Sequence, residues 1–407
     1  MKSDSSDSSI HPSIIMVMGG TDCNGLGIIR AFGKRKIPVI LLNINNYDVM
    51  RYSKYVTLRL KCPNTLECED SLVNFLIKFG RHINEKIMFI PASDYEVLFL
   101  SKNKERLEQY YYIPTPSYEI VQNIVNKKKF YKMLEKMNFP HPKTYFPKDL
   151  DDLQRMGYEI NYPFIIKPAY SFQFFQEFGK KNFVIHSYDE LLWAVNKLRN
   201  KSLEIIVQEL IPGRDIYMFY TYLNKQSEPI AICGYDKILQ FPDDFGSGSY
   251  CRSRLRASPI KECIRLLREI KYHGFAEPEL KKDPRDGVYK LLEINARTTT
   301  QNRLAAACGV DIEYLAYLDA RGELNKNYST FRENINWAAD LTYILSCLRL
   351  QRQGQLKFKD MLRIIKTRKV HSIRDFDDPF PYIFYMFKLS LRTVNQKVKA
   401  LTQSMRF

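Results

Sequence analysis

Three residues in the last third of the chain have the types and spacing that could bind a metal ion. Glu293 and Asn295 are two positions apart in the apolar segment LLEIN, so on a β-strand their side chains leave the same face. Glu279 lies on an earlier predicted strand, and the intervening PRDG predicts a hairpin turn that brings Glu279 opposite them. Carboxylate and amide oxygens suit a hard cation. A solvated strand face would explain any one of these residues alone, but LLEIN is too apolar for an edge that is merely wet.

Lysines in two other segments have the chemistry to bind phosphate. Lys167 ends FIIK, a strand of buried type, where a charged group is costly unless it is paired or faces a ligand. A phosphate group is a natural partner for such a lysine. Lys128 lies in the run KKK, where a solvated helix face is a strong alternative, and which lysine of the run faces inward stays open.

The first 120 residues alternate between predicted strands and helices. One βαβ unit is predicted by IIMVMGG, TDCNGLGIIRAFGKRKI and PVILLN in succession. The glycines of this unit do not fit the dinucleotide fingerprint GxGxxG, so a tight strand-to-helix turn explains them better than a ligand-binding loop: Gly19, Gly20, Gly25 and Gly27. With a further strand and helix in IMFIPASDYEVLFL, residues 12–120 are predicted to form a doubly wound α/β domain.

A change of composition near residue 120 predicts a domain boundary, after which the pattern is α+β. A Lys-rich helix precedes the strand YPFIIKP, and the aromatic stretch AYSFQFFQEFGKKNF predicts a flexible cover between two strands. An amphipathic helix with a Ser N-cap is predicted by SYDELLWAVNKLRN, and a strand, a glycine turn and a strand by LEIIVQELIPGRDIYMFYTYL. A glycine–serine loop is predicted by DDFGSGSYCRS.

The composition excludes several classes of protein. The 407 residues are 45% hydrophobic and 26% charged, which is typical of a globular chain with two or three domains. The eight cysteines form no CxxC pair or metal-type cluster, so we expect free thiols in a reducing cytosol. No run approaches the roughly 18–20 apolar residues of a membrane span, which favours a cytoplasmic protein. Despite a net charge of +17, no nucleic-acid-binding motif is present, so no nucleic-acid partner is expected.

The order of these segments resembles the ATP-grasp superfamily. The resemblance covers residues 12–320 and rests on KKKFYKML, PFIIKP, VQELIPGRD, GFAEPELKKD and KLLEINAR, of which the last is fairly specific. With GGTDCNGLGIIRAFGKRKIPV at the front and DFGSGSY in the middle, the chain is most similar to a bacterial subgroup of carboxylate–amine ligases that includes D-aspartate ligases.

The sequence pattern and the resemblance together predict a domain organisation. A disordered tail, residues 1–11, would precede the amino-terminal domain, residues 12–120. The two ATP-grasp lobes would be residues 121–200 and 201–325, with ATP between them, and a basic helical extension would occupy residues 326–407.

The resemblance also implies roles for individual residues. Lys167 would contact the α- and β-phosphates of ATP, and Arg297 would steady the transferred phosphate or the carboxylate, so these two are the expected catalytic residues. Mg²⁺, or Mn²⁺ in its place, would be bound by Glu279, Glu293 and Asn295. The other implied nucleotide-binding residues are Lys128, Lys181, Lys237, the hinge residues Gln208, Glu209, Leu210 and Ile211, and Asp215 for the ribose.

The loops depart from the family pattern. Many members cover the phosphates with a Gly-rich loop, which AYSFQFFQEFGKKNF replaces here. We expect the cover to act through Phe174, Phe175 and either Lys180 or Lys181. Specificity would lie in the amino-terminal domain and in the DDFGSGSYCRSR loop, where Arg252 and Arg254 would either hold an acidic substrate or be surface charge.

The implied reaction joins a small-molecule carboxylate to an amine. A cell-envelope precursor is one candidate substrate. A homodimer is one candidate assembly of the chain. The carboxylate attacks the γ-phosphate, and the amine then attacks the acyl phosphate to give ADP, phosphate and an amide. Because this chemistry brings negative groups together, metal ions and lysines must neutralise them. Two alternatives stay open: a kinase or carboxylase-type phosphoryl transfer on the same scaffold, and a nucleotide-binding regulatory module.

The carboxyl-terminal segment lies outside the resemblance and is strongly basic. Residues 351–407 hold 13 Lys and Arg against 4 Asp, and both QLKFKDMLRIIKTRKVH and FPYIFYMFKLSLRTVNQKVKAL predict amphipathic helices. Either these helices pack on the core, or they rest peripherally on an anionic membrane. In the second case the interfacial aromatic residues would be Tyr382, Phe384, Tyr385 and Phe387, and we expect deletion of residues 355–407 to spare the ATPase chemistry.

Overall fold

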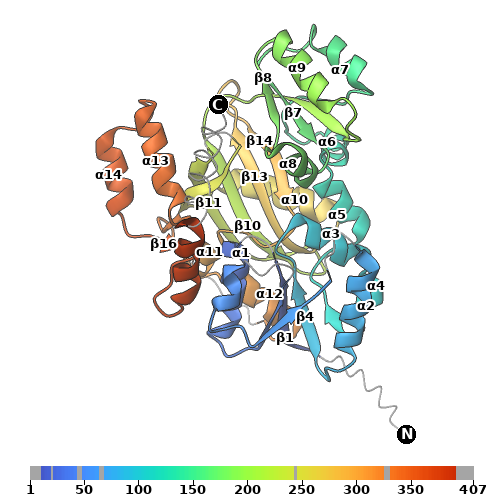
Figure 1. Ribbon diagram of the computed structural model, residues 1–407, viewed down its shortest axis with the longest axis vertical. Coiled ribbons are helices and arrows are strands. Elements are labelled where there is room, and N and C mark those ends of the chain that lie inside the picture. Colours follow the sequence, from blue (N-terminus) through green and yellow to red (C-terminus); the bar gives the residue numbers. More distant parts are fainter. Residues whose placement is uncertain are drawn as a thin grey trace, which may run out of the picture.

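The computed structural model describes residues 11–19, 22–43, 48–63, 68–242, 245–324 and 331–390. Within these residues the chain forms three sheets of five, four and seven strands, and the amino-terminal sheet lies at the opposite end of the molecule from the four-stranded sheet (Figure 1). The expectations for the first ten residues, for Gly20 and for residues 391–407 lie outside the described part of the chain.

The amino-terminal sheet is parallel and doubly wound, as predicted. Its strand order is β3-β2-β1-β4-β5, so the order reverses between β1 and β4. The strands are β1 (Pro12–Met18), β2 (Val39–Asn43), β3 (Leu58–Lys61), β4 (Lys86–Ile90) and β5 (Tyr111–Tyr112). The helices are α1 (Asp22–Gly33), the 3₁₀ turn η1 (Val49–Tyr52), α2 (Glu69–Gly80), α3 (Asp94–Lys102) and α4 (Lys104–Leu107).

Two glycines of α1 allow close packing, which neither interpretation of these glycines anticipated. A Cβ atom on Gly25 would lie 2.0 Å from the sulfur of Met50, and one on Gly27 would lie 1.9 Å from the Oδ1 atom of Asn302. Only glycine avoids these overlaps. The second contact brings the amino-terminal domain directly against the large lobe, and the buried residues of both regions form one hydrophobic core. Because this core is shared, the domain boundaries expected from the sequence stay predictions.

The four-stranded sheet is antiparallel with the order β6-β9-β7-β8. Its strands are β6 (Thr144–Tyr145), β7 (Phe164–Pro168), β8 (Phe183–Ile185) and β9 (Ile205–Glu209), and its helices are α5 (Tyr118–Val125), α6 (Lys127–Lys136), α7 (Leu150–Met156), α8 (Ser171–Phe178) and α9 (Tyr188–Leu198). Along β7, Phe164 and Ile166 enter the core beneath α7 and α9. Alternation along the strand therefore directs Lys167 to the opposite face.

The stretch after Lys167 is a helix, α8, and not the flexible cover expected from its sequence. Phe174 is fully buried, and its ring centroid lies 4.6 Å from that of Phe178 and 4.8 Å from that of Phe183. Phe175 is 61% exposed. Helical spacing of the aromatic residues builds a small core here, so Phe174 is a packing residue and not a phosphate cover.

The seven-stranded sheet has the order β14-β13-β10-β11-β12-β15-β16 and is antiparallel except for the last pair. Its strands are β10 (Ile216–Leu223), β11 (Pro229–Phe241), β12 (Ser247–Ser253), β13 (Gly274–Lys282), β14 (Tyr289–Asn295), β15 (Asn336–Ala338) and β16 (Val370–His371). The helices that follow or cover it are α10 (Ala257–Glu269), α11 (Asn302–Ala307), α12 (Ile312–Ala320), α13 (Thr342–Arg352) and α14 (Phe358–Lys366).

Much of the predicted glycine–serine loop is strand β12, so that expectation is wrong for residues 247–253. Glycine and serine indicate a loop when only local propensity is considered. Here β12 pairs on one side with β11 and on the other with β15, and the neighbouring strands override the propensity.

The carboxyl-terminal extension is not simply helical, because β15 and β16 join the large sheet. Residues 380–390 are helical, and Tyr382, Phe384 and Tyr385 pack against the core that contains the amino-terminal domain. The rings of Phe384 and Tyr52 stack at a centroid distance of 3.4 Å. These residues therefore follow the core-packing interpretation, and only Phe387 of the four expected interfacial aromatic residues is strongly exposed. Deletion of residues 355–407 would remove a strand as well as a tail.

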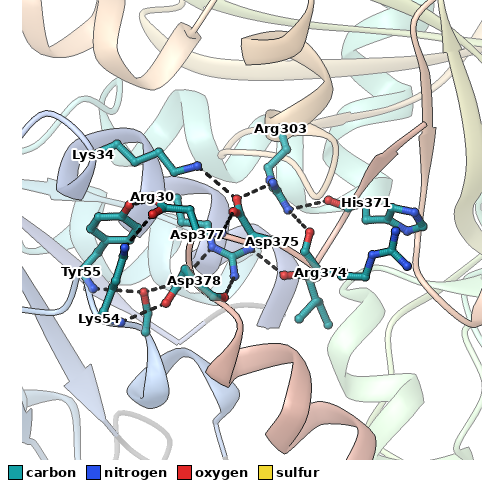
Figure 2. Close-up of polar contacts among 12 residues, drawn as sticks. Arg30, Lys34, Lys54, Tyr55, Arg303, His371, Arg374, Asp375, Asp377 and Asp378 are labelled. Carbon is teal, nitrogen blue, oxygen red and sulfur yellow. Dashed lines mark hydrogen bonds and ion pairs between the residues drawn. The ribbon is translucent and has the colours of Figure 1, made fainter. Parts of the chain in front are cut away.

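Residues 371–378, which we call the latch, connect the extension to α1 and to the turn after η1 (Figure 2). The Nε atom of Arg30 lies 3.0 Å from the Oδ2 atom of Asp378, and the two side chains are 3% and 0% exposed. The other guanidinium nitrogens of Arg30 donate to the carbonyls of Ile373 and Asp378, at 2.7 and 3.0 Å. The Asp378 carboxylate also accepts from the Ser53 hydroxyl and the Lys54 amide. Protein groups thus surround this buried ion pair.

Two further latch carboxylates bind cations from other elements (Figure 2). Asp375 lies 2.7 Å from a guanidinium nitrogen of Arg303 on α11 and 3.1 Å from the ammonium of Lys34. Asp377 pairs with Lys54 at 2.7 Å, and both of these side chains are about half exposed. The three acids of the latch are therefore all neutralised within the molecule.

Candidate active site

A cavity of about 260 Å³ is lined by residues of the four-stranded and seven-stranded sheets and of the segment that joins them. Its lining combines apolar side chains, such as Ile211 and Leu292, with the cations Lys237 and Lys281. Apolar walls with a few convergent polar groups are typical of small-molecule sites. The residues expected from the sequence that line this cavity are Lys167, Gln208, Glu209, Leu210, Ile211, Lys237 and Glu279.

The predicted hairpin forms, and its register sets the acidic residues opposite one another. Glu279 on β13 faces Glu293 on β14, and Glu277 faces Asn295. Side chains directly opposite each other in an antiparallel pair have Cβ atoms about 4.5–5.5 Å apart, so two carboxylates can reach one cation. The hairpin therefore places two of the three predicted metal ligands opposite each other, with Asn295 two positions beyond Glu293 on the same strand.

A lysine neutralises each of the two carboxylates. The Nζ atom of Lys237 lies 2.7 Å from Glu279, and that of Lys127 lies 3.0 Å from Glu293. Lys127 holds the pKa of the Glu293 carboxyl well below its usual range. Lys127 comes from α6 and Lys237 from β11, so the two lobes each supply one cation to the hairpin.

Asn295 is oriented by its neighbours. Its Nδ2 atom donates to the Oε2 atom of Glu277 at 3.0 Å, and its Oδ1 atom accepts from Arg297 at 2.9 Å. Glu277 is buried and also accepts from the hydroxyls of Tyr235 and Thr299, while burial raises the pKa of its carboxyl. The sequence analysis missed Glu277, although its two-residue spacing from Glu279 places both on one face of β13.

Arg297 connects this hairpin to the amino-terminal domain. Its Nε atom donates to the Oδ1 atom of Asp94 at 3.0 Å, and its Nη1 atom donates to the carbonyl of Thr298. Asp94 is the first residue of α3, just beyond the carboxyl end of β4. Ligands bind at this edge of open parallel sheets where the strand order reverses. That rule is the signal that could have identified Asp94 from the sequence.

A second cavity of about 20 Å³ adjoins the hairpin and is lined by Asp94, Lys127, Ser171, Phe172, Glu293 and Asn295, among others. Glu279 faces the large cavity, whereas Glu293 and Asn295 face the small one. The pair of opposed carboxylates therefore contributes one member to the lining of each cavity.

Lys167 reaches the large cavity from β7. Its Nζ atom lies 2.7 Å from the Oε1 atom of Gln208, whose Nε2 atom donates to the hydroxyl of Thr144. Burial lowers the pKa of the Lys167 ammonium to about 8. The cost of burying this charge is consistent with a lysine that awaits an anionic partner.

Lys128, expected to bind nucleotide, lines neither cavity. Its ammonium lies 2.9 Å from Glu204, whereas Lys127 is the lysine of the KKK run that contacts Glu293. Adjacent residues of a helix point about 100° apart, and composition cannot decide which of them faces inward. Lys181 is exposed and lines neither cavity, although its charge helps to lower the pKa of Glu293.

Asp215 does not line the cavity either, although its neighbours Arg214 and Ile216 do. Its carboxylate lies 3.5 Å from Arg256 and is 44% exposed. Alternation at the start of β10 directs it to the other face. The Nε atom of Arg252 donates to the Oδ1 atom of Asn336 on the neighbouring strand β15. Arg252 lines neither cavity, which agrees with the surface-charge interpretation.

The hairpin residues fit a metal ion that is held jointly with phosphate. Within the described residues, no group of three or more His, Cys, Asp and Glu side chains is arranged to hold a metal ion. Glu279, Glu293 and Asn295 instead offer two carboxylates and one amide. Mg²⁺ commonly takes one or two carboxylates and completes its shell with substrate phosphates and water, so this donor set suits it.

Comparisons with known proteins agree with this geometry, although no protein-family model matches the chain. The chain is 27% identical over 305 residues to D-aspartate ligase of Enterococcus faecium. The alignment covers 70% of this chain and 72% of that protein. The L-amino acid ligase of Bacillus licheniformis superposes with a TM-score of 0.61 at 16% identity, covering 80% of this chain and 79% of that one. N5-carboxyaminoimidazole ribonucleotide synthetase, solved as an ADP complex, gives 0.62 at 14% identity, with coverages of 85% and 86%.

The chain has the ATP-grasp fold, which these structural neighbours share. In sequence, the chain is similar to D-aspartate ligase.

Proposed function

We propose that this chain uses Mg²⁺-ATP to activate a small carboxylate as an acyl phosphate and joins it to an amine. The observation that carries the proposal is the register of β13 and β14, which sets Glu279 of the large cavity opposite Glu293 of the small one. A lysine from each lobe already neutralises one of these carboxylates.

Each residue of the site has a part in this reaction. The base of ATP lies in the large cavity against the hinge segment 208–211. Lys167 and Lys237, which line the same cavity, bind the phosphates of ATP. Glu279, Glu293 and Asn295 would hold Mg²⁺, which would neutralise charge on the phosphates. Lys127 stays beside Glu293 and offsets negative charge on the side of the small cavity. Electrostatic positioning of this kind provides much of the acceleration in phosphoryl transfer.

Arg297 binds the carboxylate that is to be activated. Its planar guanidinium carries several N–H donors, lies next to Asn295, and is oriented by the hydrogen bond to Asp94. Asp94 belongs to the amino-terminal domain, so this domain helps to shape the substrate site. The relative named D-aspartate ligase makes D-aspartate the first carboxylate to test.

Release of ADP tests the proposed function. The chain is incubated with Mg²⁺-ATP alone, then with D-aspartate and other amino acids, and then with amines in addition. We expect ADP release that requires a carboxylate and an amide product that mass spectrometry detects. ADP release that requires bicarbonate or a hydroxyl acceptor instead would favour the carboxylase or kinase alternative. Nucleotide binding without turnover of any substrate would favour the regulatory module.

We also propose that the helical residues 380–390 contact an anionic lipid surface, which would bring the enzyme to a cell-envelope precursor. Phe380, Ile383 and Phe387 recur every three or four residues and are 57%, 55% and 60% exposed. The opposite side of this helix packs on the core. The acids of the latch are neutralised internally, whereas the cations Lys366 and Arg368 of the same extension are exposed. No described helix has the length and hydropathy needed to cross a bilayer, so the contact would be superficial.

Sedimentation with vesicles tests this contact. The chain should bind phosphatidylglycerol vesicles at low salt, release them as salt rises, and ignore phosphatidylcholine vesicles. A triple variant with serine at positions 380, 383 and 387 should lose binding and keep ADP release. Phe358→Ser, at an exposed phenylalanine of α14, is the matched control. A wild-type chain that ignores anionic vesicles, or that covers this face by forming a dimer, would contradict the proposal.

A further inference from the structure

The carboxyl-terminal extension reaches the large cavity. Leu350 of α13 lines it, and every other lining residue that the structure describes lies between residues 142 and 292. Leu350 is 6% exposed, and it belongs to one hydrophobic cluster with Leu239 of β11, which also lines the cavity. An element outside the resemblance to ATP-grasp proteins therefore contributes a wall of the candidate nucleotide site.

Helix α13 is fastened beside this wall. Tyr343, Cys347 and Leu350 lie on one side of the helix and pack in the cluster that contains Leu239. The hydroxyl of Ser346 donates to the carbonyl of Gln240, another lining residue, at 2.9 Å. Figure 1 shows α13 alongside the large sheet next to β11. Because the contacts involve both side chain and backbone, the position of Leu350 is fixed relative to the cavity.

The extension also contacts the hinge. Arg214 lines the cavity in the segment between β9 and β10, and its guanidinium donates to the Oε1 atom of Gln355, which lies between α13 and α14. The hinge and the extension are thus joined beside the cavity: Leu350 and Arg214 line it, and Gln355 binds Arg214.

We propose that α13 is a nucleotide-binding element, in which Leu350 packs against the base and the contact between Arg214 and Gln355 holds the hinge and the extension together around it. This inference rests on the proposed function, because it takes the large cavity as the ATP site. Leu350 is apolar and has no group that could bind phosphate or move a proton, so it contributes to nucleotide affinity and not to the chemical step. Loss of its side chain should weaken binding of the base and leave the binding of phosphates unchanged.

Binding of ADP and of inorganic tripolyphosphate tests this role, measured by calorimetry and by competition. Leu350→Ala should weaken ADP binding about tenfold, which is typical for the loss of apolar contact in a pocket. The affinity for tripolyphosphate and kcat at saturating ATP should not change. Leu345→Ala and Leu348→Ala are matched controls, because these leucines of the same helix are 48% and 38% exposed and do not line the cavity. Gln355→Ala, at an exposed position, should weaken ADP binding by a smaller factor and keeps the test open if Leu350→Ala fails to fold.

The outcomes separate the inference from the function on which it rests. If the wild-type chain binds no ADP, the proposed function itself fails. If the wild-type chain binds ADP and both Leu350→Ala and Gln355→Ala bind it equally well, α13 has no role in nucleotide binding. Equal losses for ADP and tripolyphosphate, or a lower kcat, would mean that α13 supports the lobe as a whole, which also overturns the inference.

Discussion

The latch and the carboxylate pair of the candidate active site contain the same kinds of residues in different surroundings. In the latch, Arg30 and Asp378 are almost fully buried, and protein donors and acceptors surround them. At the site, Glu293 is 39% exposed, Lys127 is 14% exposed, and both border a cavity. An ion pair that protein groups enclose can only hold the fold together. An ion pair that borders a cavity can exchange its partner for a ligand.

This comparison predicts which property each cluster controls. Breaking the latch should reduce stability and spare the turnover of the molecules that stay folded. Breaking the pair at the site should reduce turnover and spare stability. The following variants test these two statements, and the expected effects decrease from one to the next.

Asp378→Ala should destabilise the protein by about 3–5 kcal/mol, because it leaves the charge of Arg30 buried without a carboxylate. Asp377→Ala, in the same latch, breaks a pair whose side chains are 49% and 52% exposed and should have a much smaller effect on stability, because solvent screens the pair. Urea unfolding measures both. Equal effects of the two variants would show that burial does not separate them.

Glu293→Gln should lower kcat about 10³-fold, because it removes a charge that acts directly on the metal ion and phosphates. Its unfolding free energy should change by no more than about 1 kcal/mol, since the side chain is partly exposed. Glu204→Gln, which alters the exposed partner of Lys128, is the control and should keep wild-type turnover. Wild-type ADP release by Glu293→Gln at saturating Mg²⁺ would remove the metal assignment.

Lys127→Met should lower kcat/KM about 10²-fold, whereas Lys128→Met should leave it nearly unchanged. The two lysines are adjacent in sequence, but only Lys127 contacts Glu293 and lines a cavity. Steady-state ADP release separates them. A larger loss of kcat/KM for Lys128→Met than for Lys127→Met would place Lys128 at the site and contradict a role for the pair of Lys127 and Glu293.

The KM for ATP should rise with pH above about 8. Burial lowers the pKa of the Lys167 ammonium to about 8, so above that pH the nucleotide-free enzyme loses the charge that binds phosphate. One proton is involved, and KM should therefore rise by about tenfold per pH unit. The effect on stability has the opposite sign. Between pH 8 and 10.5 the unfolded chain, in which this lysine has its usual pKa of 10.5, binds the proton, whereas the folded chain has released it. The free energy of unfolding should therefore increase with pH in this range. Lys167→Arg keeps its charge and should show a flat KM profile from pH 7 to 9.5, and a flat wild-type profile would contradict the assignment.

The sequence predicted the features that depend on short-range geometry. The PRDG turn and strand alternation set Glu279 opposite Glu293, and the same alternation directed Lys167 away from the core. Only a few neighbouring residues determine each of these features, so a pattern of period two was sufficient.

The features that the sequence did not predict depend on direction or on distant partners. The choice between Lys127 and Lys128 depends on the rotation of α6, and the position of Asp215 depends on where β10 begins. Leu350 lines the cavity only because α13 packs on β11, more than a hundred positions away in the sequence. No local pattern of hydropathy or charge contains that information.

The latch has a consequence for the order in which the protein folds. Arg30 and Asp378 are 348 positions apart, so Arg30 is synthesised long before the carboxylate of Asp378 that accepts its hydrogen bond. During synthesis, α1 therefore carries a cation that has no buried carboxylate to meet, and the amino-terminal domain cannot complete its packing until the latch emerges. Contacts between residues so far apart in sequence also slow folding, because a long loop must close before they form. We expect the nascent amino-terminal domain to stay open to proteases until Asp378 has left the ribosome, and then to become protected together with the rest of the chain.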